Sequence, residues 1–573
     1  MKRSTYIILI ILFFLALAAV GTVFVVIEDL GGRPVEVPAR GYLDIPLAGA
    51  IPEIAPPESL ATVLIGRRPV TMHDLWENLR KAKVDDRIQE VVLRLGLLEC
   101  DWAKANEIRE AILDFRRSSK RVYALIEEAP DFDLEYFIAT ACDRIILQPL
   151  GWLGINGIGG YVPFLKGFFD KVGIQAQFEH IAEFKTATNM FTEKGFTAAH
   201  REETESLYRD IFDQYVAIAA KARGKSPQEF RALLDQGSFH GERAKAAGLA
   251  DDCLYEDEVQ DLLRRDGGGS IAPVAFDSYT RVSPSSVGLE TGPHTVALIY
   301  ATGMIVSGES LPELMGGSTV AAWIRGARTD PMVQAIVLRI DSPGGSSVGS
   351  DVIWREVALA RKAKPVIVSM SDMAGSGGYW IALPATKIVA QPQTLTGSIG
   401  VLAGKFSING LMAKLGVTAD KVAFGAHADE YSMFRPFTED ELKALRDDLT
   451  WTYGQFLDRT AAGRGLTRAE VDDVGKGRVW TGRQAKDRKL IDELGGLTMA
   501  VGLAKKEAKI GAEEEVRLDV WPRRRTFWQA LFSGQGFGLD ARSSGVREKL
   551  LEASRLMQQT KVWAIMPFWV KPQ

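Results

Sequence analysis

SDMAGSGGYW, residues 371–380, is the stretch around which the chain is organised. It follows PVIVSM (365–370), an apolar run with the length and the β-branched residues of a buried strand. Residues 379–383 then indicate the start of a helix. This order, in which a strand is followed by a small-residue turn, a serine and a helix, would expose the Ser376 hydroxyl at the end of the strand. The N–H groups at the start of the helix would then be directed at a nearby oxyanion. A Gly/Ser turn without chemistry remains the alternative for this stretch taken alone.

Length and composition are those of a globular protein with several domains. The 573 residues are 46% hydrophobic and 25% charged, and the net charge of −4 gives no reason to expect nucleic acid as a partner. The three cysteines lie too far apart in the sequence for a disulfide framework or a metal knuckle, and the six histidines show no paired spacing. We therefore expect no metal and no cofactor.

The N-terminus carries a candidate membrane anchor, predicted over residues 1–28. Residues 6–27 contain no charge and would form a helix about 33 Å long, enough to span a bilayer core. Lys2 and Arg3 precede this run and Glu28 follows it, which predicts a cytoplasmic N-terminus and an extracytoplasmic remainder. A cleaved signal peptide is the alternative, although the run is longer than a usual signal-peptide core.

Alternating strand and helix patterns indicate a globular unit over residues 42–264. IQEVVLRL (88–95) is typical of a strand, residues 103–117 of a helix, and residues 122–126 of a second strand. This alternation predicts a parallel sheet with crossover helices, and therefore an α/β fold.

Three further segments complete the predicted domain organisation. Residues 265–293 are rich in Gly, Ser and Pro and are predicted to be a linker. A second unit, residues 294–521, begins with the strand pattern of residues 295–300. The C-terminal extension, residues 522–573, contains several aromatic residues and is either a packing extension or a membrane-surface segment.

The two units repeat each other in sequence. Four pairs of short matches keep an offset of 241 to 245 residues: VVLRL (91–95) with IVLRI (336–340), QP (148–149) with QP (391–392), FT (196–197) with FT (437–438), and GERAK (241–245) with GRQAK (482–486). A register held over this distance predicts an internal duplication.

The two halves differ where chemistry is expected. Ser376 aligns with Asp133, and the glycines around the serine are missing from the first half. The first half instead has EFKTA (183–187), in which Lys185 aligns with Ala426. Each half therefore keeps a different part of one site.

A serine hydroxyl needs a base to become a nucleophile. Lys185 is the candidate base, and it would need a pKa lowered by burial from about 10.4 to about 7–8. His427 is the alternative base. Donors for an oxyanion are expected from the backbone N–H groups of Gly345 (or Gly344) and Gly377, at two glycine-rich strand ends.

Three motifs in this order, DSPGG (341–345), MAGSGGY (373–379) and TGSIG (396–400), closely resemble the signal peptide peptidase A family of serine proteases in its long, duplicated form. The similarity covers roughly residues 42–520. It implies tandem Clp-protease/crotonase-like domains and a Ser-Lys dyad without metal, with Ser376 as nucleophile and Lys185, in the first half's FKTA motif, as its base.

The resemblance also implies what the protein acts on and where. Family members cleave remnant signal peptides and other hydrophobic peptides at the membrane and assemble into rings, so we expect a homo-oligomer, with a tetramer favoured. The anchor would place the protein in the inner (plasma) membrane with its catalytic part on the extracytoplasmic side. Two alternatives remain: a crotonase-like acyl-CoA enzyme, and a catalytically inactive membrane scaffold.

Overall fold

The computed structural model describes residues 36–55, 69–127, 129–311, 313–523 and 563–566. The predicted anchor, residues 1–28, lies outside the described residues, as does most of the C-terminal extension. Among the residues described, no helix is both long and apolar enough to cross a membrane.

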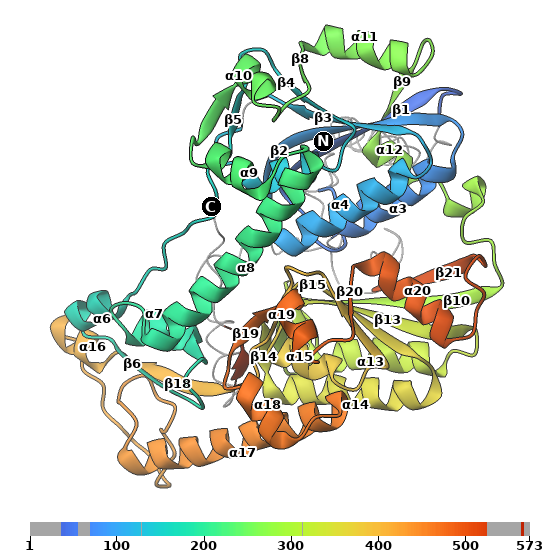
Figure 1. Cartoon of the computed structure of the whole chain (residues 1–573). Helices are drawn as coiled ribbons and strands as arrows, with labels where there is room; N and C mark the ends of the chain where they lie inside the picture. The colour runs from blue at the N-terminus through green and yellow to red at the C-terminus, as the bar shows by residue number, and fades with distance from the viewer. Residues whose placement is uncertain (1–35, 56–68, 128, 312, 524–562, 567–573) are drawn as a thin grey trace, which may run out of the picture.

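The first unit is built on a parallel sheet with the strand order β8-β4-β3-β2-β1-β9 (Figure 1). Its strands are β1 (Gly41–Ala50), β2 (Ile88–Glu99), β3 (Arg121–Ile126), β4 (Arg144–Leu147), β8 (Asp252–Cys253) and β9 (Ala272–Ala275). A short antiparallel pair, β5 (Trp152–Gly154) and β7 (Ser238–His240), stands beside this sheet. The helices of the unit's core are α3 (Met72–Val84), α4 (Trp102–Arg116), α5 (Asp133–Ala139), α9 (Pro227–Leu234), α10 (Gly241–Ala246) and α11 (Glu256–Asp266).

The second unit repeats this topology. Its main strands are β10 (His294–Thr302), β13 (Val333–Ser342), β15 (Val366–Gly375), β16 (Lys387–Ala390), β20 (Glu493–Leu494) and β21 (Val516–Trp521), in the order β20-β16-β15-β13-β10-β21. An antiparallel pair again stands at one side, β17 (Leu395–Gly397) with β19 (Val479–Thr481). The matching helices are α13 (Gly317–Thr329), α14 (Ser347–Ala363), α15 (Gly377–Ala382), α18 (Arg468–Val474), α19 (Gly482–Asp487) and α20 (Leu497–Glu507). The prediction of tandem α/β units is confirmed.

The segment predicted as a linker belongs largely to the first unit. β9 (Ala272–Ala275) pairs in parallel with β1, and α12 (Phe276–Thr280) follows it directly, then a 3₁₀ turn, η2 (Pro284–Val287). Lys81 Nζ, on α3, donates hydrogen bonds to the carbonyl oxygens of Tyr279 (3.0 Å) and Val282 (2.9 Å). The prediction was wrong here because Gly- and Pro-rich composition cannot distinguish a linker from an edge strand that buries only a few apolar side chains.

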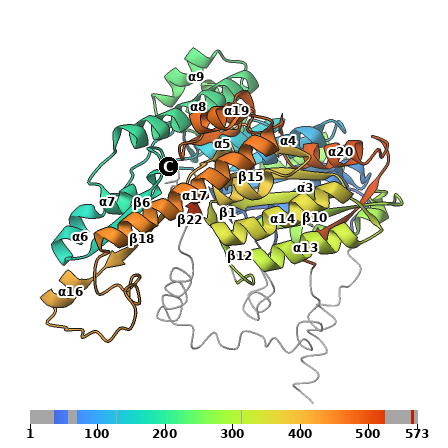
Figure 2. The same cartoon turned by 90° about the horizontal axis from the view of Figure 1, so that it is seen from below.

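An arm of the first unit reaches across to the second. The long helix α8 (Ala198–Ala222) leaves the first unit toward the second, where α17 (Glu439–Arg464) is its counterpart (Figure 1). At the far end of the arm, β6 (Gln175–His180) pairs antiparallel with β18 (Leu402–Ser407) of the second unit. The short elements beside this pair are α6 (Lys166–Val172), η1 (Thr186–Thr188), α7 (Asn189–Thr192) and α16 (Asn409–Lys414), and Figure 2 shows α6 and α16 projecting away from the main sheets.

A third sheet combines both units and the C-terminal extension. Its order is β12-β11-β14-β22-β18-β6, in which the remaining strands are β11 (Met304–Val306), β12 (Leu314–Gly316), β14 (Gly344–Ser346) and β22 (Trp563–Ile565). The strand β22 pairs antiparallel with β14 and β18. This part of the extension therefore packs into the fold.

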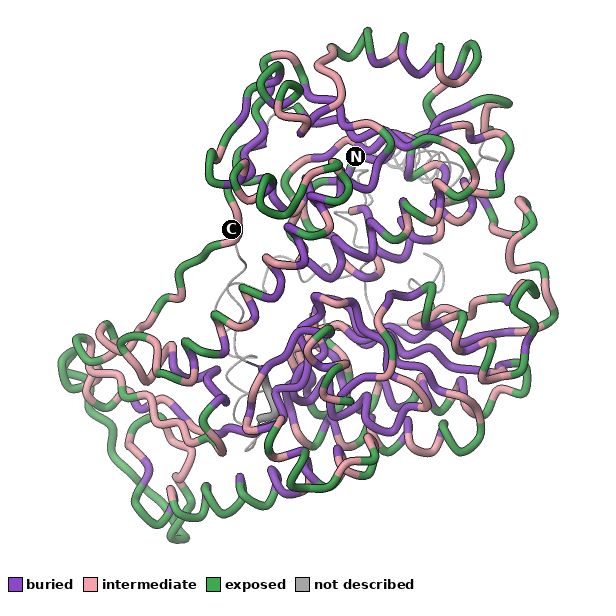
Figure 3. Tube along the Cα trace, viewed as in Figure 1, coloured by how far each residue is buried: buried purple, intermediate pink, exposed green. Residues whose placement is uncertain are grey.

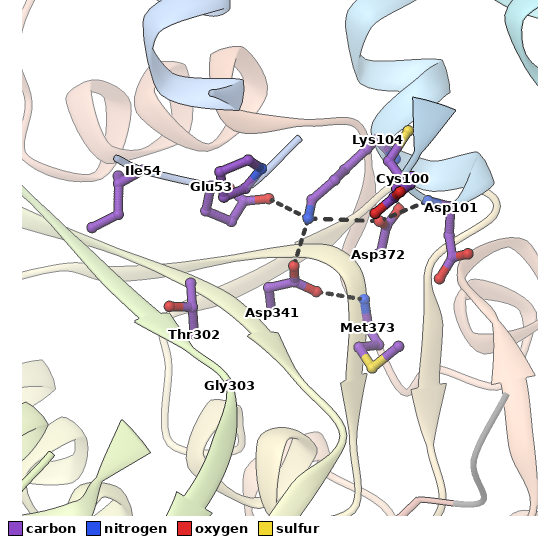
Figure 4. A pocket seen from close by; sticks show the side chains of 12 residues that line it. Glu53, Ile54, Cys100, Asp101, Lys104, Thr302, Gly303, Asp341, Asp372 and Met373 are labelled. Atoms are coloured by element: carbon purple, nitrogen blue, oxygen red, sulfur yellow. Dashed lines mark hydrogen bonds and ion pairs between the residues drawn. The ribbon is translucent and has the colours of Figure 1, made fainter. Parts of the chain in front are cut away.

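Buried charges join the two units beneath the site. Arg339, on β13, is almost fully buried and forms ion pairs with Glu53 (2.8 Å) and Glu107 (2.6 Å) of the first unit. Nearby, Lys104 Nζ lies 2.7 Å from an Asp341 carboxylate oxygen (Figure 4). The Asp372 carboxylate accepts the Lys104 N–H at 2.8 Å. Because β13 and β15 lead directly into the glycine-rich turns, these contacts fix the two strand ends that form the site.

Candidate active site

Ser376 lies between the end of β15 and the start of α15, as the sequence predicted. Its backbone has φ +53° and ψ −110°, a conformation that costs energy for a residue with a side chain. A hydrogen bond from the Ser376 N–H to the Gly397 carbonyl (2.8 Å) helps to hold the turn. A Cβ atom at Gly378 would lie 2.8 Å from the Ser342 carbonyl oxygen, so the turn requires glycine there.

Lys185 comes from the first unit and meets Ser376 across the seam. Its Nζ lies 2.8 Å from Ser376 Oγ, 3.0 Å from Ser398 Oγ and 3.1 Å from the Ser398 carbonyl oxygen. Ser376 Oγ also donates to the Gly400 carbonyl at 3.2 Å. Lys185, Ser376 and Ser398 are all completely buried. The structure thus brings together the two predicted residues, which are 191 positions apart in one chain.

The electrostatic surroundings of Lys185 favour the neutral amine. Burial lowers the pKa of Lys185 well below its ordinary value, and only the charge of Glu203 opposes this shift. Burial also raises the pKa of the Glu203 carboxyl to about 8, so this group is mostly protonated at neutral pH. Glu203 is held by the Val479 N–H (2.6 Å) and by Thr186 Oγ1 (3.2 Å). A neutral Glu203 gives the ammonium form of Lys185 little stabilisation.

Two glycines of the second unit make room for Lys185. A Cβ atom on Gly477, which has φ +81°, would lie 2.5 Å from the Lys185 backbone nitrogen. A Cβ atom on Gly400 would lie 3.1 Å from Lys185 Cδ. Sequence reasoning assigned no role to Gly477, Gly400 or Ser398. The TGSIG motif contains Ser398 and Gly400 and could have indicated them; the role of Gly477 depends on the packing alone.

The predicted oxyanion donors belong to two segments: Gly344 and Gly345 to β14, and Gly377 to the start of α15, directly after Ser376. The Gly344 N–H already donates to Ser342 Oγ (3.2 Å). The Gly345 backbone, with φ +152°, packs so closely on Ile305 that a Cβ atom would lie 2.1 Å from the Ile305 carbonyl oxygen. Gly377 is the first residue of α15, where a helix provides no acceptor for the N–H group. Of the three predicted donors, Gly344 is thus already engaged through its N–H, whereas the Gly377 N–H lies at a helix start.

His427, the alternative base, lies in an exposed position away from this group. Its ring nitrogen faces Glu441 at 3.7 Å, and the side chain is 61% exposed. The polar groups that contact Ser376 Oγ are Lys185 Nζ and the Gly400 carbonyl. In the first unit, the place of the serine is taken by Phe132 and not by Asp133, which the sequence alignment had predicted: Phe132 immediately precedes α5, and its N–H donates to the Gly154 carbonyl (2.7 Å) as the Ser376 N–H does to the Gly397 carbonyl. The geometry thus favours Lys185 over His427.

Comparison with known proteins agrees with this geometry. The sequence model of the family described as "Peptidase family S49" matches residues 114–268 and 358–511, one stretch in each unit. The chain belongs to peptidase family S49. This S49 chain is 33% identical over 493 residues to "Serine protease SPPA, chloroplastic" of Arabidopsis thaliana, covering 84% of this chain and 72% of that protein. It is 31% identical over 571 residues to "Protease 4" of Salmonella typhi, and the match covers 95% of this chain and 89% of that protein.

A third relative, "Protease 4" of Haemophilus influenzae, is 29% identical over 451 residues, which cover 76% of this chain and 73% of that protein. The match to the long relatives and the two S49 domains show that this chain has the duplicated form of the family. It is therefore a serine peptidase, and so a hydrolase.

Proposed function

We propose that this S49 peptidase is an endopeptidase with a Ser-Lys dyad, in which Ser376 is the nucleophile and Lys185 the general base. The single observation that carries the proposal is the distance of 2.8 Å between Lys185 Nζ and Ser376 Oγ, both buried. A lysine can accept a proton only when neutral, and the surroundings of Lys185 lower its pKa in that direction. Ser398 orients the amine.

The reaction then follows from this arrangement. Lys185 Nζ takes the proton of Ser376 Oγ as the oxygen attacks the carbonyl carbon of the peptide. The electron pair of the carbonyl bond moves to its oxygen, which the Gly345 and Gly377 N–H groups would bind. The C–N bond breaks as the Lys185 ammonium returns its proton to the leaving nitrogen. Water, activated by the same amine, then hydrolyses the acyl-serine ester.

The substrates we propose are hydrophobic peptides at a membrane, remnant signal peptides among them. The resemblance of the three motifs supports this substrate class, and the charge-free run of residues 6–27 supports a single-pass anchor. With two positive residues before that run, the catalytic part would lie on the extracytoplasmic side of the inner membrane. Each unit would then have the Clp-protease/crotonase-like fold that the motifs imply.

We also propose a homo-oligomer, with a tetramer favoured. The projecting arm, residues 161–191 and 402–434, carries large apolar side chains in exposed positions, and Figure 3 colours much of it as exposed or intermediate. Among them are Tyr161 (95%), Val422 (89%) and Phe424 (92%). Such a surface is typical of a protein–protein or membrane contact. Light scattering on the detergent-solubilised chain should show several subunits, and a fully active monomer would contradict the assembly.

The decisive experiment labels the nucleophile. The purified chain should react with a serine-directed covalent probe at Ser376 and should cleave an apolar fluorogenic peptide. The variant Ser376→Ala should lose both properties while keeping its melting temperature, because it removes one buried oxygen and no packing contact. Full peptidase activity in Ser376→Ala would refute the proposed role of Ser376. An acyl-CoA enzyme or an inactive scaffold would show no peptide cleavage at all.

A further inference from the structure

The C-terminal extension places one strand directly beside the glycines of the site. β22 (Trp563–Ile565) lies between β14 and β18 and is antiparallel to both. Gly344 is paired with Ile565 and Gly345 with Ala564, and the Met566 N–H donates to the Pro343 carbonyl at 2.7 Å. The extension therefore follows the backbone of the strand that carries the proposed oxyanion donors.

Without β22, this position would be a slot one strand wide. The third sheet would separate into β12-β11-β14 on one side and β18-β6 on the other, and each part would present unpaired backbone groups to the slot. An extended peptide binds such an edge by adding a strand, with main-chain hydrogen bonds for affinity and side-chain pockets for specificity. A slot of this shape next to Ser376 is where a peptide substrate would bind.

Met566 packs directly on Gly375, the residue before the nucleophile. Its side chain is 98% buried and packs on Gly375, where an added Cβ atom would lie 2.5 Å from Met566 Sδ and 3.0 Å from Met566 Cβ. Met566 belongs to the same apolar cluster as Leu395 and Val479, on the strands β17 and β19 that border the site. Membership of this apolar cluster makes a charged side chain costly to bury at this position.

We propose that residues 563–566 occupy the place of the substrate, so that the extension is an intramolecular competitor of peptide substrates. This inference rests on the proposed peptidase function. In this arrangement β14 and β18 form the two edges of the substrate slot, and a bound peptide runs antiparallel to both. The residue of the peptide that lies beside Gly375 is preferably apolar. The next residue in the sequence is Pro567, whose nitrogen is a tertiary amide inside a ring. A proline nitrogen carries no N–H, so it has no backbone donor to add to a strand pairing.

The size of the effect follows from tethering. A ligand that belongs to the same chain as its binding site is present at an effective concentration that can reach the millimolar range, here taken as roughly 1 mM. If the free segment binds with a Kd of about 0.1 mM, the apparent KM of a competing peptide rises about tenfold. The value of kcat does not change, because a saturating substrate displaces the segment.

The test compares the full chain with a chain that ends at residue 562, both solubilised in detergent and assayed with a short apolar fluorogenic peptide. We expect the shortened chain to have a KM about tenfold lower with the same kcat. A synthetic peptide of residues 561–573 should then inhibit the shortened chain competitively. A second variant, Met566→Asp, keeps the extension but places a charge in the apolar pocket and should lower KM to the same extent. Its matched control, Met566→Leu, should behave like the full chain.

Two results would overturn the inference. One is an unchanged KM in both the shortened chain and Met566→Asp. The other is a shortened chain with a lower kcat and melting temperature that the synthetic peptide restores, which would make β22 a structural part of the site. A failure of the peptidase function itself is recognised separately: the shortened chain carrying Ser376→Ala would then remain active.

Discussion

Replacing Lys185 by arginine tests the proposed base most directly. Arginine keeps the positive charge and much of the length of the side chain, but its guanidinium stays protonated at any pH at which the protein is folded. It cannot accept the proton of Ser376. We therefore expect Lys185→Arg to be nearly as inactive as Lys185→Ala. Lys185→Met, which keeps the volume without an amine, should be equally inactive and should keep the fold.

The expected loss can be worked out from the surroundings of the amine. A lysine with an ordinary pKa of about 10.4 is neutral in only about 1 molecule in 2,500 at pH 7. Complete burial next to a protonated Glu203 lowers the pKa of Lys185 far enough to make the neutral amine a substantial fraction. A positioned general base contributes about 10²- to 10⁴-fold to a rate. The loss in kcat/KM for Lys185→Arg should fall in this range.

The assay is the pH dependence of kcat/KM for an apolar fluorogenic peptide. Activity should rise with pH through one deprotonation, near neutral to mildly alkaline pH, because only the neutral amine is active. The pKa read from this rise should lie well below 10.5, the direction in which burial shifts Lys185. Melting temperatures of the variants show whether the fold is kept.

His427→Ala is the matched control. Its ring is exposed and faces Glu441, so its loss should change the rate by no more than a few-fold. Lys185→His could keep a trace of activity, because imidazole is largely neutral at pH 7. If His427→Ala abolished turnover while Lys185→Arg kept it, the base would be the histidine and the assignment of the dyad would be wrong.

Three further predictions concern the surroundings of the site. Glu203→Gln should move the rise of activity only slightly, to lower pH, because the Glu203 carboxyl, with its pKa raised to about 8, is mostly uncharged at neutral pH and only its ionised fraction raises the pKa of Lys185; a large shift in either direction would contradict this. Gly477→Ala should reduce kcat about 10²-fold, because its methyl group would lie 2.5 Å from the Lys185 backbone nitrogen and displace the amine; unchanged kinetics would show that the loop can move aside. Arg339→Met should lower the free energy of unfolding by about 3–5 kcal/mol, measured by denaturant titration, because it removes the ion pair of the buried Glu107 and leaves the buried Glu53 with Lys104 at 3.7 Å; an unchanged midpoint would show that these charges are not needed for the fold.

Much of the fold followed from local patterns. The parallel sheets were predicted from apolar runs such as residues 365–370, because the length and the branched side chains of a buried strand are properties of the strand itself. The turn at Ser376 was predicted for the same reason, since its glycines show where the backbone must bend closely. The segment 265–293 was misassigned because its pairing with β1 depends on a strand more than 220 residues earlier.

The duplication, the serine turn and the motif around Lys185 could be predicted from the amino-acid sequence, because each is a short pattern that is repeated or bounded within one segment. The packing of distant segments brings Lys185 to Ser376, surrounds the amine with Glu203 and two glycines, and places the strand of residues 563–565 beside Gly344 and Gly345. The lowered pKa of Lys185 and the pairing of residues 563–565 both arise from burial. The pKa of an amine and the occupant of a strand edge depend on which distant segments exclude water, and that depends on how the whole chain packs.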